Sequence, residues 1–479
     1  MSQNTDDQQV KDSLVQLRCH FTWDLQIEDS EMPDLENRVL DQIEFLDSKH
    51  AKVGIHNLLA YVKHLKGQNE DALESLKEAE DLIQREYPDQ TDLRSLVTWG
   101  NFAWVYYHIG RLAQVQTYLN KVEKTCQKFG NLFRYRVECP EMDCAEGWAL
   151  LKCGGKNYER AKACFEKALE KDPENPEFSS GYAITAYRLD GFKAKIKGHM
   201  EFSLHPLRQA VRLNPEDQYV KVLLALKLQD EGQEAEGEKY IEEALANMSS
   251  QTYVFRYAAK FYRRRGHLDK ALQLLQSALK ATPTSAFLHH QIGICYRGQM
   301  IQINMATNSQ PRGQDREKAD RIIRSAISHF EFAVDIKPTF EIAYVDLARM
   351  YIEAGNYRKA EDTFQKVLTM NPVVREIMQE VHFYYGQFQE FQKKSEVNAL
   401  IHYLKAITIG DPSVAKDKSI NSLRKLAFKR LQRNASDLES LSILGFAYKL
   451  KGNMEEAVEY YERALRLAAD SANSLGRGF

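Results

Sequence analysis

The sequence predicts an all-α fold, a superhelix of stacked antiparallel helix pairs, on three observations. Apolar residues recur three or four residues apart through most of the chain, the spacing that places them on one face of a helix. A pattern of small and large apolar residues returns at a nearly constant interval. Glycine and proline stand where one helix of a pair would end. Together these features predict a repeat solenoid rather than a single globular core.

The stretch from Tyr344 to Pro372 contains one complete unit of this pattern. Its apolar stripe runs through Tyr344, Leu347, Ala348 and Tyr351 in the first helix and through Ala360, Phe364 and Val367 in the second. We expect the chain to turn at Gly355, between the two runs. Pro372 stands where the second helix must stop, because proline lacks the backbone N–H and clashes with the preceding turn. A helix pair of about 34 residues is the pattern of the tetratricopeptide repeat.

Two positions of this unit recur along the chain. The first is a small residue where the two helices touch, occupied by Ala72, Val115, Ala161, Gly237, Ala271, Ala326, Ala360, Ala399 and Ala457. The second, four residues later, is a large apolar residue: Leu76, Leu119, Phe165, Ile241, Leu275, Phe330, Phe364, Tyr403 and Tyr461. Unit ends are marked by Pro173, Pro215, Pro283, Pro338 and Pro372. So many units in one register predict a tetratricopeptide-repeat superhelix, with one less regular unit between Ala161 and Gly237.

Some segments depart from the register. A Lys- and Gly-rich insertion at 191–202 follows Asp190. Ala271 and Ala326 lie 55 residues apart in place of about 34, so about 21 residues are inserted, within 298–320. The spacing loosens again in the C-terminal part. Long insertions in repeat arrays lie on one face and carry function in some proteins, and in others they are tolerated surface loops.

The charge of the chain is nearly balanced, with 65 Lys and Arg against 67 Asp and Glu and a formal net charge of -2. This balance provides no global attraction to nucleic acid, so any anion site must come from local clustering. The polar N-terminus does not resemble a signal peptide, and no apolar run is long enough to span a membrane. The seven cysteines contain no C-x-x-C pair. We therefore expect a cytoplasmic protein with reduced cysteines and no membrane contact.

The sequence contains no recognisable catalytic set. Gly154-Gly155-Lys156 suggests a phosphate loop, but that motif needs Gly where Leu150 stands and Ser or Thr where Asn157 stands. No metalloprotease, nucleophile-elbow or dinucleotide motif is present either. We expect a protein that is not an enzyme and that needs no cofactor and no metal.

The inner groove of the superhelix is more informative. In the first helix of each unit, the residues that do not pack against neighbours face this groove. They include Trp104, Tyr107, Glu177, Ile184, Tyr187, Arg188, Tyr219, Arg256, Lys260, Arg263, Arg264, Phe287, His290 and Arg297. Arg256, Lys260 and Arg263 share one helix face with no acid between them. Cations interleaved with aromatic rings suit a single-stranded nucleic acid, whose phosphates need charge and whose bases stack on rings. A peptide groove would have the same features, and each residue taken alone is more simply a solvated or packing side chain.

Long stretches of the chain resemble the interferon-induced proteins with tetratricopeptide repeats. The segments that carry the resemblance are LRCHFTW (17–23), MPDLENRVLDQIEFLD (32–47), GIHNLLAYVKHLKGQNEDAL (54–73), WALLKCGGKNYERAKACFEKAL (148–169) and YYERALRLAAD (460–470). The resemblance covers essentially the whole chain. It implies an antiviral protein that binds the 5′ end of single-stranded RNA, triphosphorylated or capped without ribose 2′-O-methylation, and that inhibits translation of the bound mRNA.

The resemblance also implies roles for individual residues. In the cap pocket, Trp148 would stack on the guanine, Leu46 and Ile184 would form apolar walls, Glu177 would accept hydrogen bonds from the base edge, and Ser48 and Asp217 would complete the site. Arg38, Gln42, Lys152 and Arg188 would hold the 5′ phosphates. Tyr158, His290 and Gln291 would contact the first ribose and its 2′-OH, and Tyr219, Arg256, Lys260 and Lys337 would contact the following nucleotides. Tyr461 and Leu465 match the Y-x-x-x-L element through which family members associate.

Two residues depart from a similar member of this family. Ser48 replaces Thr, and Asp217 replaces Asn, so a hydrogen-bond donor is lost at the second position. Whether Asp217 weakens or strengthens guanine binding depends on the direction in which it points.

From these features we divide the chain into four parts. They are a disordered N-terminus (1–10), an N-terminal repeat subdomain with the cap pocket (11–245), a middle subdomain lining an RNA channel (246–390) and a C-terminal subdomain for association (391–479). The expected partners are viral or unmethylated capped RNA, related repeat proteins of the family, and a second copy of the chain. The main alternative is a tetratricopeptide-repeat adaptor that binds peptides in innate immune signalling.

Overall fold

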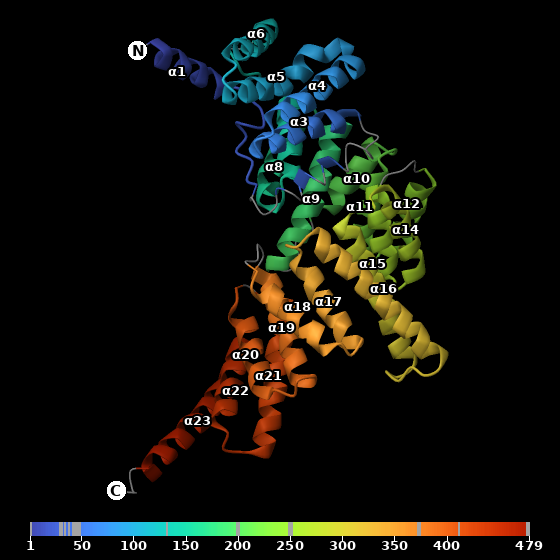
Figure 1. Ribbon diagram of the computed structural model, residues 1–479, viewed down its shortest axis with the longest axis vertical. Helices are drawn as coiled ribbons and strands as arrows, with labels where there is room; N and C mark the ends of the chain where they lie inside the picture. Colours follow the sequence, from blue (N-terminus) through green and yellow to red (C-terminus); the bar gives the residue numbers. More distant parts are fainter. Residues whose placement is uncertain are drawn as a thin grey trace. The chain divides into compact units, whose positions relative to one another are not determined.

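The computed structural model describes residues 2–27, 32, 35–36, 39–40, 49–130, 133–197, 202–247, 252–370, 375–410 and 412–475. Every regular element among these residues is a helix, which confirms the predicted all-α fold (Figure 1). Contacts divide the chain into two compact units. Unit 1 comprises residues 1–194 and 198–284, and unit 2 comprises 195–197 and 285–479.

Unit 1 contains the helices up to α14. They are α1 (Ser2–Leu14), α3 (Lys49–Leu65), α4 (Asn69–Glu86), η2 (Pro88–Gln90), α5 (Thr91–His108), α6 (Leu112–Lys128), α7 (Pro140–Lys152), η3 (Gly155–Asn157), α8 (Tyr158–Lys171), α9 (Pro176–Lys197), α10 (Leu204–Leu213), α11 (Gln218–Asp230), α12 (Glu234–Ala246), α13 (Thr252–Arg264) and α14 (Leu268–Ala281).

Unit 2 contains α15 to α23. They are α15 (Ala286–Ala306), α16 (Gln314–Ile336), α17 (Glu341–Glu353), α18 (Tyr357–Leu368), α19 (Arg375–Phe391), α20 (Glu396–Thr408), α21 (Val414–Arg433), α22 (Leu438–Leu450) and α23 (Met454–Leu475). In both units, consecutive helices pack as antiparallel pairs, as in α3 with α4 and α22 with α23 (Figure 1).

The recurring apolar positions form the cores of the helix pairs, as the register predicts. Ala72, Ala161, Ala271, Ala326, Ala360 and Ala399 have no exposed surface, and neither do Phe165, Phe330, Phe364 and Tyr403. Tyr461 in the last helix is the exception, because it is only half-buried.

Phe165 is packed between two glycines of neighbouring helices. A Cβ atom on Gly181 of α9 would lie 2.2 Å from the ring, and one on Gly147 of α7 would lie 3.0 Å from it. Both distances are too short for carbon–carbon contact, so α7 and α9 approach the ring this closely only because both positions are glycine. Gly147 directly precedes Trp148, and Gly181 lies two turns before Arg188.

The turn at Gly355 and the helix ends before four of the prolines lie where the sequence analysis expects them. Gly355 has a φ of +72°, in the left-handed region that favours glycine. Pro173, Pro215, Pro283 and Pro338 each follow the C-cap residue of a helix. Pro372 lies outside the described residues.

In the described residues, both insertions lengthen helices. The insertion at 191–202 extends α9 as far as Lys197. The insertion at 298–320 adds turns to both α15 and α16, so that these two helices form an extended hairpin closed by residues 307–313 (Figure 1).

The N-terminal segment differs from expectation, since residues 2–10 belong to helix α1 where the sequence analysis expects disorder. The boundary between the two units, at 284/285, also matches neither of the predicted subdomain boundaries. The fourfold division of the chain therefore stays a prediction.

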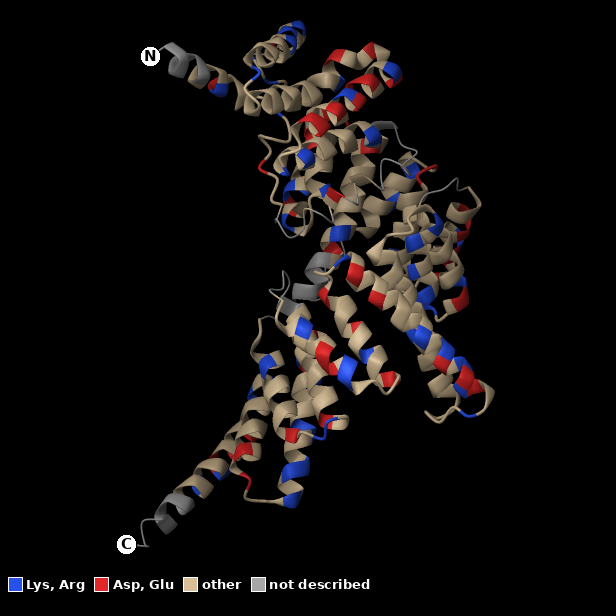
Figure 2. Ribbon diagram, viewed as in Figure 1, with Lys and Arg blue, Asp and Glu red and all other residues tan. Residues whose placement is uncertain are grey.

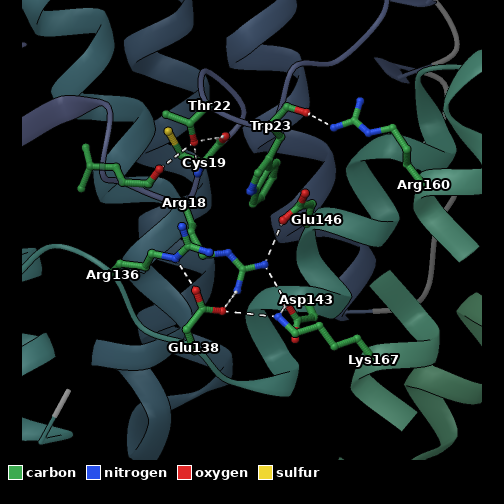
Figure 3. A network of polar contacts seen from close by, with 11 residues as sticks. Arg18, Cys19, Thr22, Trp23, Arg136, Glu138, Asp143, Glu146, Arg160 and Lys167 are labelled. Atoms are coloured by element: carbon green, nitrogen blue, oxygen red, sulfur yellow. Dashed lines mark hydrogen bonds and ion pairs between the residues drawn. The ribbon is translucent and has the colours of Figure 1, made fainter. Parts of the chain in front are cut away.

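Arg18 anchors the segment after α1 to helix α7 (Figure 3). Its guanidinium contacts Glu138 at 3.1 Å, Asp143 at 2.7 Å and Glu146 at 2.8 Å. Lys167 of α8 contacts Asp143 at 3.0 Å, so the network joins three parts of unit 1. Because Arg18 is largely buried and pairs with three carboxylates, removing it leaves the buried Asp143 with Lys167 as its remaining cation.

Basic and acidic residues are interspersed along the helices of both units, in keeping with the near-zero net charge (Figure 2). Among the described residues, no helix is both long and apolar enough to cross a bilayer.

Candidate nucleic-acid interface

The structure allows some of the predicted site residues to be located and not others. Arg38, Gln42, Leu46 and Ser48 lie outside the described residues. Lys152, Trp148, Tyr158, Glu177, Ile184, Arg188, Asp217, Tyr219, Arg256 and Lys260 lie in unit 1, and His290, Gln291, Lys337, Tyr461 and Leu465 lie in unit 2.

Arg188 of α9 is the centre of a cluster in unit 1. Its guanidinium carbon lies 6.0 Å from the ring centre of Tyr158, the first residue of α8. One of its nitrogens donates to the carbonyl oxygen of Leu151, at 3.2 Å. Burial opposes the charged form, yet the hydroxyls of Tyr219 and Tyr158 raise the pKa of Arg188 above its ordinary value. The half-buried guanidinium therefore stays charged, and no ion pair with a described carboxylate neutralises it.

Two tyrosines from the next helix pairs complete this cluster. Tyr219 of α11 and Tyr257 of α13 have ring centres 5.6 Å apart. The buried Tyr219 hydroxyl lies near Arg188 and Tyr257 without a well-formed hydrogen bond to either. Burial raises the pKa of Tyr219 well above its usual value. Burial also opposes ionisation of Tyr257, but the nearby Arg256 and Arg188 lower its pKa.

The cations of α13 extend the positive surface. Burial and the neighbouring Arg264 lower the pKa of Lys260. Arg256 lies over the ring of Tyr257, with 5.4 Å from the guanidinium carbon to the ring centre. α13 itself contains no acid between Arg256, Lys260 and Arg263, but Asp230 at the end of α11 pairs with the adjacent Arg264 at 2.7 Å. The acid comes from a neighbouring helix, which the register of a single helix does not reveal.

Tyr158 is positioned by its neighbour Asn157, which stands where the phosphate-loop motif would need Ser or Thr. The buried Asn157 side chain accepts a hydrogen bond from the backbone N–H of Gln26 at 3.2 Å and donates one to the Gln26 carbonyl at 3.1 Å. This pairing fixes the start of α8 against the N-terminal segment.

Trp148 and Glu177 lie on either side of Cys144. The half-buried Trp148 ring meets Phe165 edge-on, with ring centres 5.4 Å apart, and its indole lies against the Cys144 thiol. That thiol donates to Glu177 at 3.8 Å. The second Glu177 oxygen lies 4.0 Å from Arg94. A stacking ring and a carboxylate therefore occur together, as the cap pocket requires, although Trp148 also packs on the core.

Ile184 and Asp217 have structural roles that the sequence analysis did not assign. Ile184 is only 3% exposed and belongs to the core of unit 1, so it offers little surface to a ligand. Asp217 is the N-cap of α11: one oxygen accepts from the backbone N–H of Val220 at 3.0 Å, and the other accepts from the Ser180 hydroxyl at 3.2 Å. Burial raises the pKa of Asp217. Asn and Asp cap helices about equally well, which explains why both residues fit this position.

In unit 2, His290 is buried and its ring nitrogen lies 3.0 Å from Asp346. Arg297 and Arg349 contact the same carboxylate. Burial alone would raise the pKa of Asp346, but His290 and the two arginines hold it below its ordinary value. Gln291 lies beside His290, at 3.4 Å, and Lys337 lies over the ring of Phe340.

The association residues differ in exposure. Leu465 is 70% exposed on α23, whereas Tyr461 is half-buried. Met454 and Val458 on the same helix are also exposed, so α23 carries an uncovered apolar strip.

Sequence reasoning missed Tyr257 and the Leu151 carbonyl. Tyr257 could have been found, because it lies one residue after Arg256 in the aromatic-rich segment YVFRYAAKFYRRR. No feature of the sequence indicated the Leu151 carbonyl, because its hydrogen bond with Arg188 depends on how α7 packs on α9.

Comparisons with known proteins agree with this architecture. Profiles of the tetratricopeptide repeat match residues 145–191, 323–376 and 438–471. The chain is 75% identical to the antiviral innate immune response effector IFIT1 of Homo sapiens, over 100% of both chains. It is 46% identical to interferon-induced protein with tetratricopeptide repeats 2 of Homo sapiens, over 97% of both chains.

Solved structures of IFIT1 are similar over nearly the whole chain. The human IFIT1 dimer with m7Gppp-AAAA has a TM-score of 0.88 and 75% identity, and the match covers 96% of this chain and 100% of that chain. The human IFIT1 dimer with PPP-AAAA has a TM-score of 0.85 and 72% identity over the same shares. Given this identity to several relatives along their full length, the chain belongs to the interferon-induced proteins with tetratricopeptide repeats.

Proposed function

We propose that this protein binds the 5′ end of single-stranded RNA in antiviral defence. The RNA is either triphosphorylated or capped without a methyl group on the first ribose 2′-oxygen. The observation that carries the proposal is Arg188, a recessed cation among three tyrosines that makes no ion pair with a described carboxylate. IFIT1, which is 75% identical to this chain over its full length, has been solved with PPP-AAAA and with Gppp-AAAA.

The chemistry of the cluster suits a compact polyanion. The Arg188 guanidinium can donate two parallel hydrogen bonds to a phosphate, and the low dielectric around it strengthens them. The additional positive charge of Arg256 and Lys260 on α13 would favour the phosphates of the next nucleotides. The rings of Tyr219 and Tyr257 offer faces on which a base can stack.

Three further residues would recognise the cap and the first ribose. Trp148 would stack on the guanine of a cap, while Glu177 would accept from its N–H groups. Tyr158 would lie against the first ribose, where a methyl on the 2′-oxygen adds bulk and removes a donor. An RNA held by its 5′ end is unavailable for initiation, so binding in the cytoplasm would inhibit its translation without any catalytic step.

The last repeat would join two chains. The exposed Leu465, together with the apolar residues Met454 and Val458, forms a surface on α23 suited to a second copy or to a related family member. This association is compatible with RNA binding because its residues are distinct from those proposed to bind RNA.

Filter binding at one fixed salt concentration tests the proposal. Three RNAs of one sequence are compared: triphosphorylated, capped without 2′-O-methylation, and hydroxyl-ended. We expect the first two to bind at least about tenfold more tightly than the third, because only they present the extra phosphates. Equal affinity for all three would refute recognition of the 5′ end, and failure to bind any of them would favour the peptide-binding adaptor.

A further inference from the structure

Unit 2 contains a positively charged hollow. Of the residues that line it, only Arg349 has been discussed above. The hollow has a volume of about 440 Å³ and lies between α17, α19 and α21. The residues that line it are Arg349 from α17, Phe383, Tyr384 and Gln387 from α19, and Lys418, Asn421, Ser422 and Lys425 from α21. Its volume is typical of pockets that hold small organic ligands.

The register of the repeats places this hollow on the groove side of unit 2. Arg349 lies eleven residues before Ala360, the small residue of its unit. Lys260 lies eleven residues before Ala271, the corresponding residue of its own unit. Arg349 thus repeats in unit 2 the position that Lys260 takes in the groove of unit 1.

The lining has three cations and no carboxylate. Neither Lys418 nor Lys425 forms an ion pair with a carboxylate in the described part of the chain. Arg349 approaches Asp346 at 3.4 Å, but that carboxylate is shared with Arg297 and His290. The hollow therefore has a positive charge that favours an anion and disfavours a metal ion.

The same hollow offers groups that recognise a base. The guanidinium carbon of Arg349 lies over the Tyr384 ring, 4.1 Å from its centre, so the two form a cationic–aromatic stack, and the partly exposed guanidinium plane can receive a base. The amides of Gln387 and Asn421 supply both donors and acceptors, and Ser422 supplies a hydroxyl. A bare phosphate would use only the cations, whereas a ligand that combines an anion with a flat polar ring would use the whole lining.

We propose that this hollow binds a nucleoside phosphate, with the phosphate on Lys418 and Lys425 and the base against Arg349 and Tyr384. The ligand has two sources, a free nucleotide or one nucleotide of an RNA strand. The proposal does not rest on recognition of a 5′ end, and it goes beyond the function proposed for unit 1.

The first experiment measures binding of adenosine monophosphate by the full chain carrying Arg188→Ala, which removes the phosphate site of unit 1. Calorimetry or ligand-observed NMR compares this protein with versions that also carry Lys418→Glu and Lys425→Glu, or Lys429→Glu. Lys429→Glu is the control because it reverses one charge on α21, as each of the other two substitutions does, while Lys429 pairs with Glu396 and does not line the hollow. All three substituted lysines are exposed, so folding is preserved.

We expect the double Lys418 and Lys425 substitution to weaken adenosine monophosphate binding by about tenfold or more, and Lys429→Glu to leave it unchanged. Ribose 5-phosphate should bind more weakly than adenosine monophosphate, because it lacks the ring that stacks. Equal affinity for these two ligands, or equal binding by the double variant and the control, would overturn the proposal.

The second experiment identifies the source of the ligand in the chain with Arg188 intact. Triphosphorylated RNAs, one a tetranucleotide and one much longer, are bound to the parent and to the double variant. A loss confined to the longer RNA assigns the hollow to an RNA nucleotide. Unchanged binding of both RNAs, with adenosine monophosphate binding lost, assigns it to a free nucleotide. If no triphosphorylated RNA binds even to the parent, the function proposed for unit 1 fails, and the result with adenosine monophosphate stands alone.

Discussion

The Arg188 guanidinium and the Tyr158 ring lie 6.0 Å apart, one on α9 and the other at the start of α8. The residue expected to hold the 5′ phosphate is thus a direct neighbour of the residue expected to contact the first ribose. In a capped or triphosphorylated RNA these two chemical groups are also adjacent. The geometry allows phosphate binding and ribose discrimination to be separated by substitution.

Arg188→Ala should weaken binding of triphosphorylated RNA and of capped RNA by about a hundredfold, since a charge-assisted hydrogen bond to phosphate contributes about 1.5 to 3 kcal/mol. Arg208→Ala is the control, because Arg208 pairs with Glu236 on the outside of the same unit. Filter binding of both RNAs measures the effect. Retention of affinity within a few fold would show that Arg188 is not the phosphate site.

Trp148→Ala should weaken capped RNA by about 1 to 3 kcal/mol, the contribution of one stacked base, and leave triphosphorylated RNA nearly unaffected. Because Trp148 also packs against Phe165, thermal unfolding of the variant should be recorded in parallel. Trp148→Phe keeps an aromatic ring and should restore part of the cap affinity. Equal losses for both RNAs would mean that Trp148 acts only through packing.

Methylation of the first ribose 2′-oxygen should weaken capped RNA by about one to two orders of magnitude, because an unpaired buried polar group costs about 1 to 3 kcal/mol. Tyr158→Ala should narrow the gap between methylated and unmethylated RNA more than it lowers affinity for the unmethylated form. His290→Ala should act in the same direction, with a loss of stability because its contact with Asp346 disappears. The measurement is the ratio of the two dissociation constants in one buffer, and the same ratio in parent and variants would contradict this role.

Leu465→Glu should separate associated chains into monomers, because it places a charge on the exposed apolar strip of α23. Val397→Glu is the control: Val397 is also an exposed apolar residue, 64% accessible, but lies on α20. Sedimentation at concentrations where the parent self-associates gives the mass of each variant. An unchanged mass for Leu465→Glu would exclude this surface as the interface.

The stability of unit 2 should fall as the pH drops from about 6.5 to about 4. His382 and His402 face each other through their Nδ1 atoms, 3.0 Å apart, and burial lowers the pKa of each to about 4. Between these pH values the unfolded chain binds protons that the folded chain does not, so acid favours unfolding. His402→Phe, which keeps a ring beside Tyr385, should flatten the dependence of the urea midpoint on pH. A slope as steep as that of the parent would assign the effect to other groups.

Much of the fold could be predicted because each repeat is a local unit. The spacing from Ala360 to Phe364, and the same spacing elsewhere, already encodes two helices and their contact. The helical form of the 298–320 insertion could not be predicted, because its helices are stabilised by each other over a long hairpin rather than by the repeat pattern.

The site was predictable only in part. The groove register pointed to Arg188 and Tyr219, which lie together in the structure. It could not reveal that Ile184 is part of the core, or that Asp230 reaches Arg264 from a neighbouring helix. Such details depend on contacts between units, and a periodic pattern within one unit does not contain them.

The ring of Phe165 acts as a spacer between α7 and α9. Since both helices that touch it do so through glycine, the thickness of this one ring sets the separation between α7, which carries Trp148, and α9, which carries Arg188. A smaller side chain at this position would let the two helices approach, and a side chain in place of either glycine would push them apart. If Trp148 and Arg188 bind as proposed, the width available to a nucleotide between them would therefore be determined by a buried residue outside the proposed site.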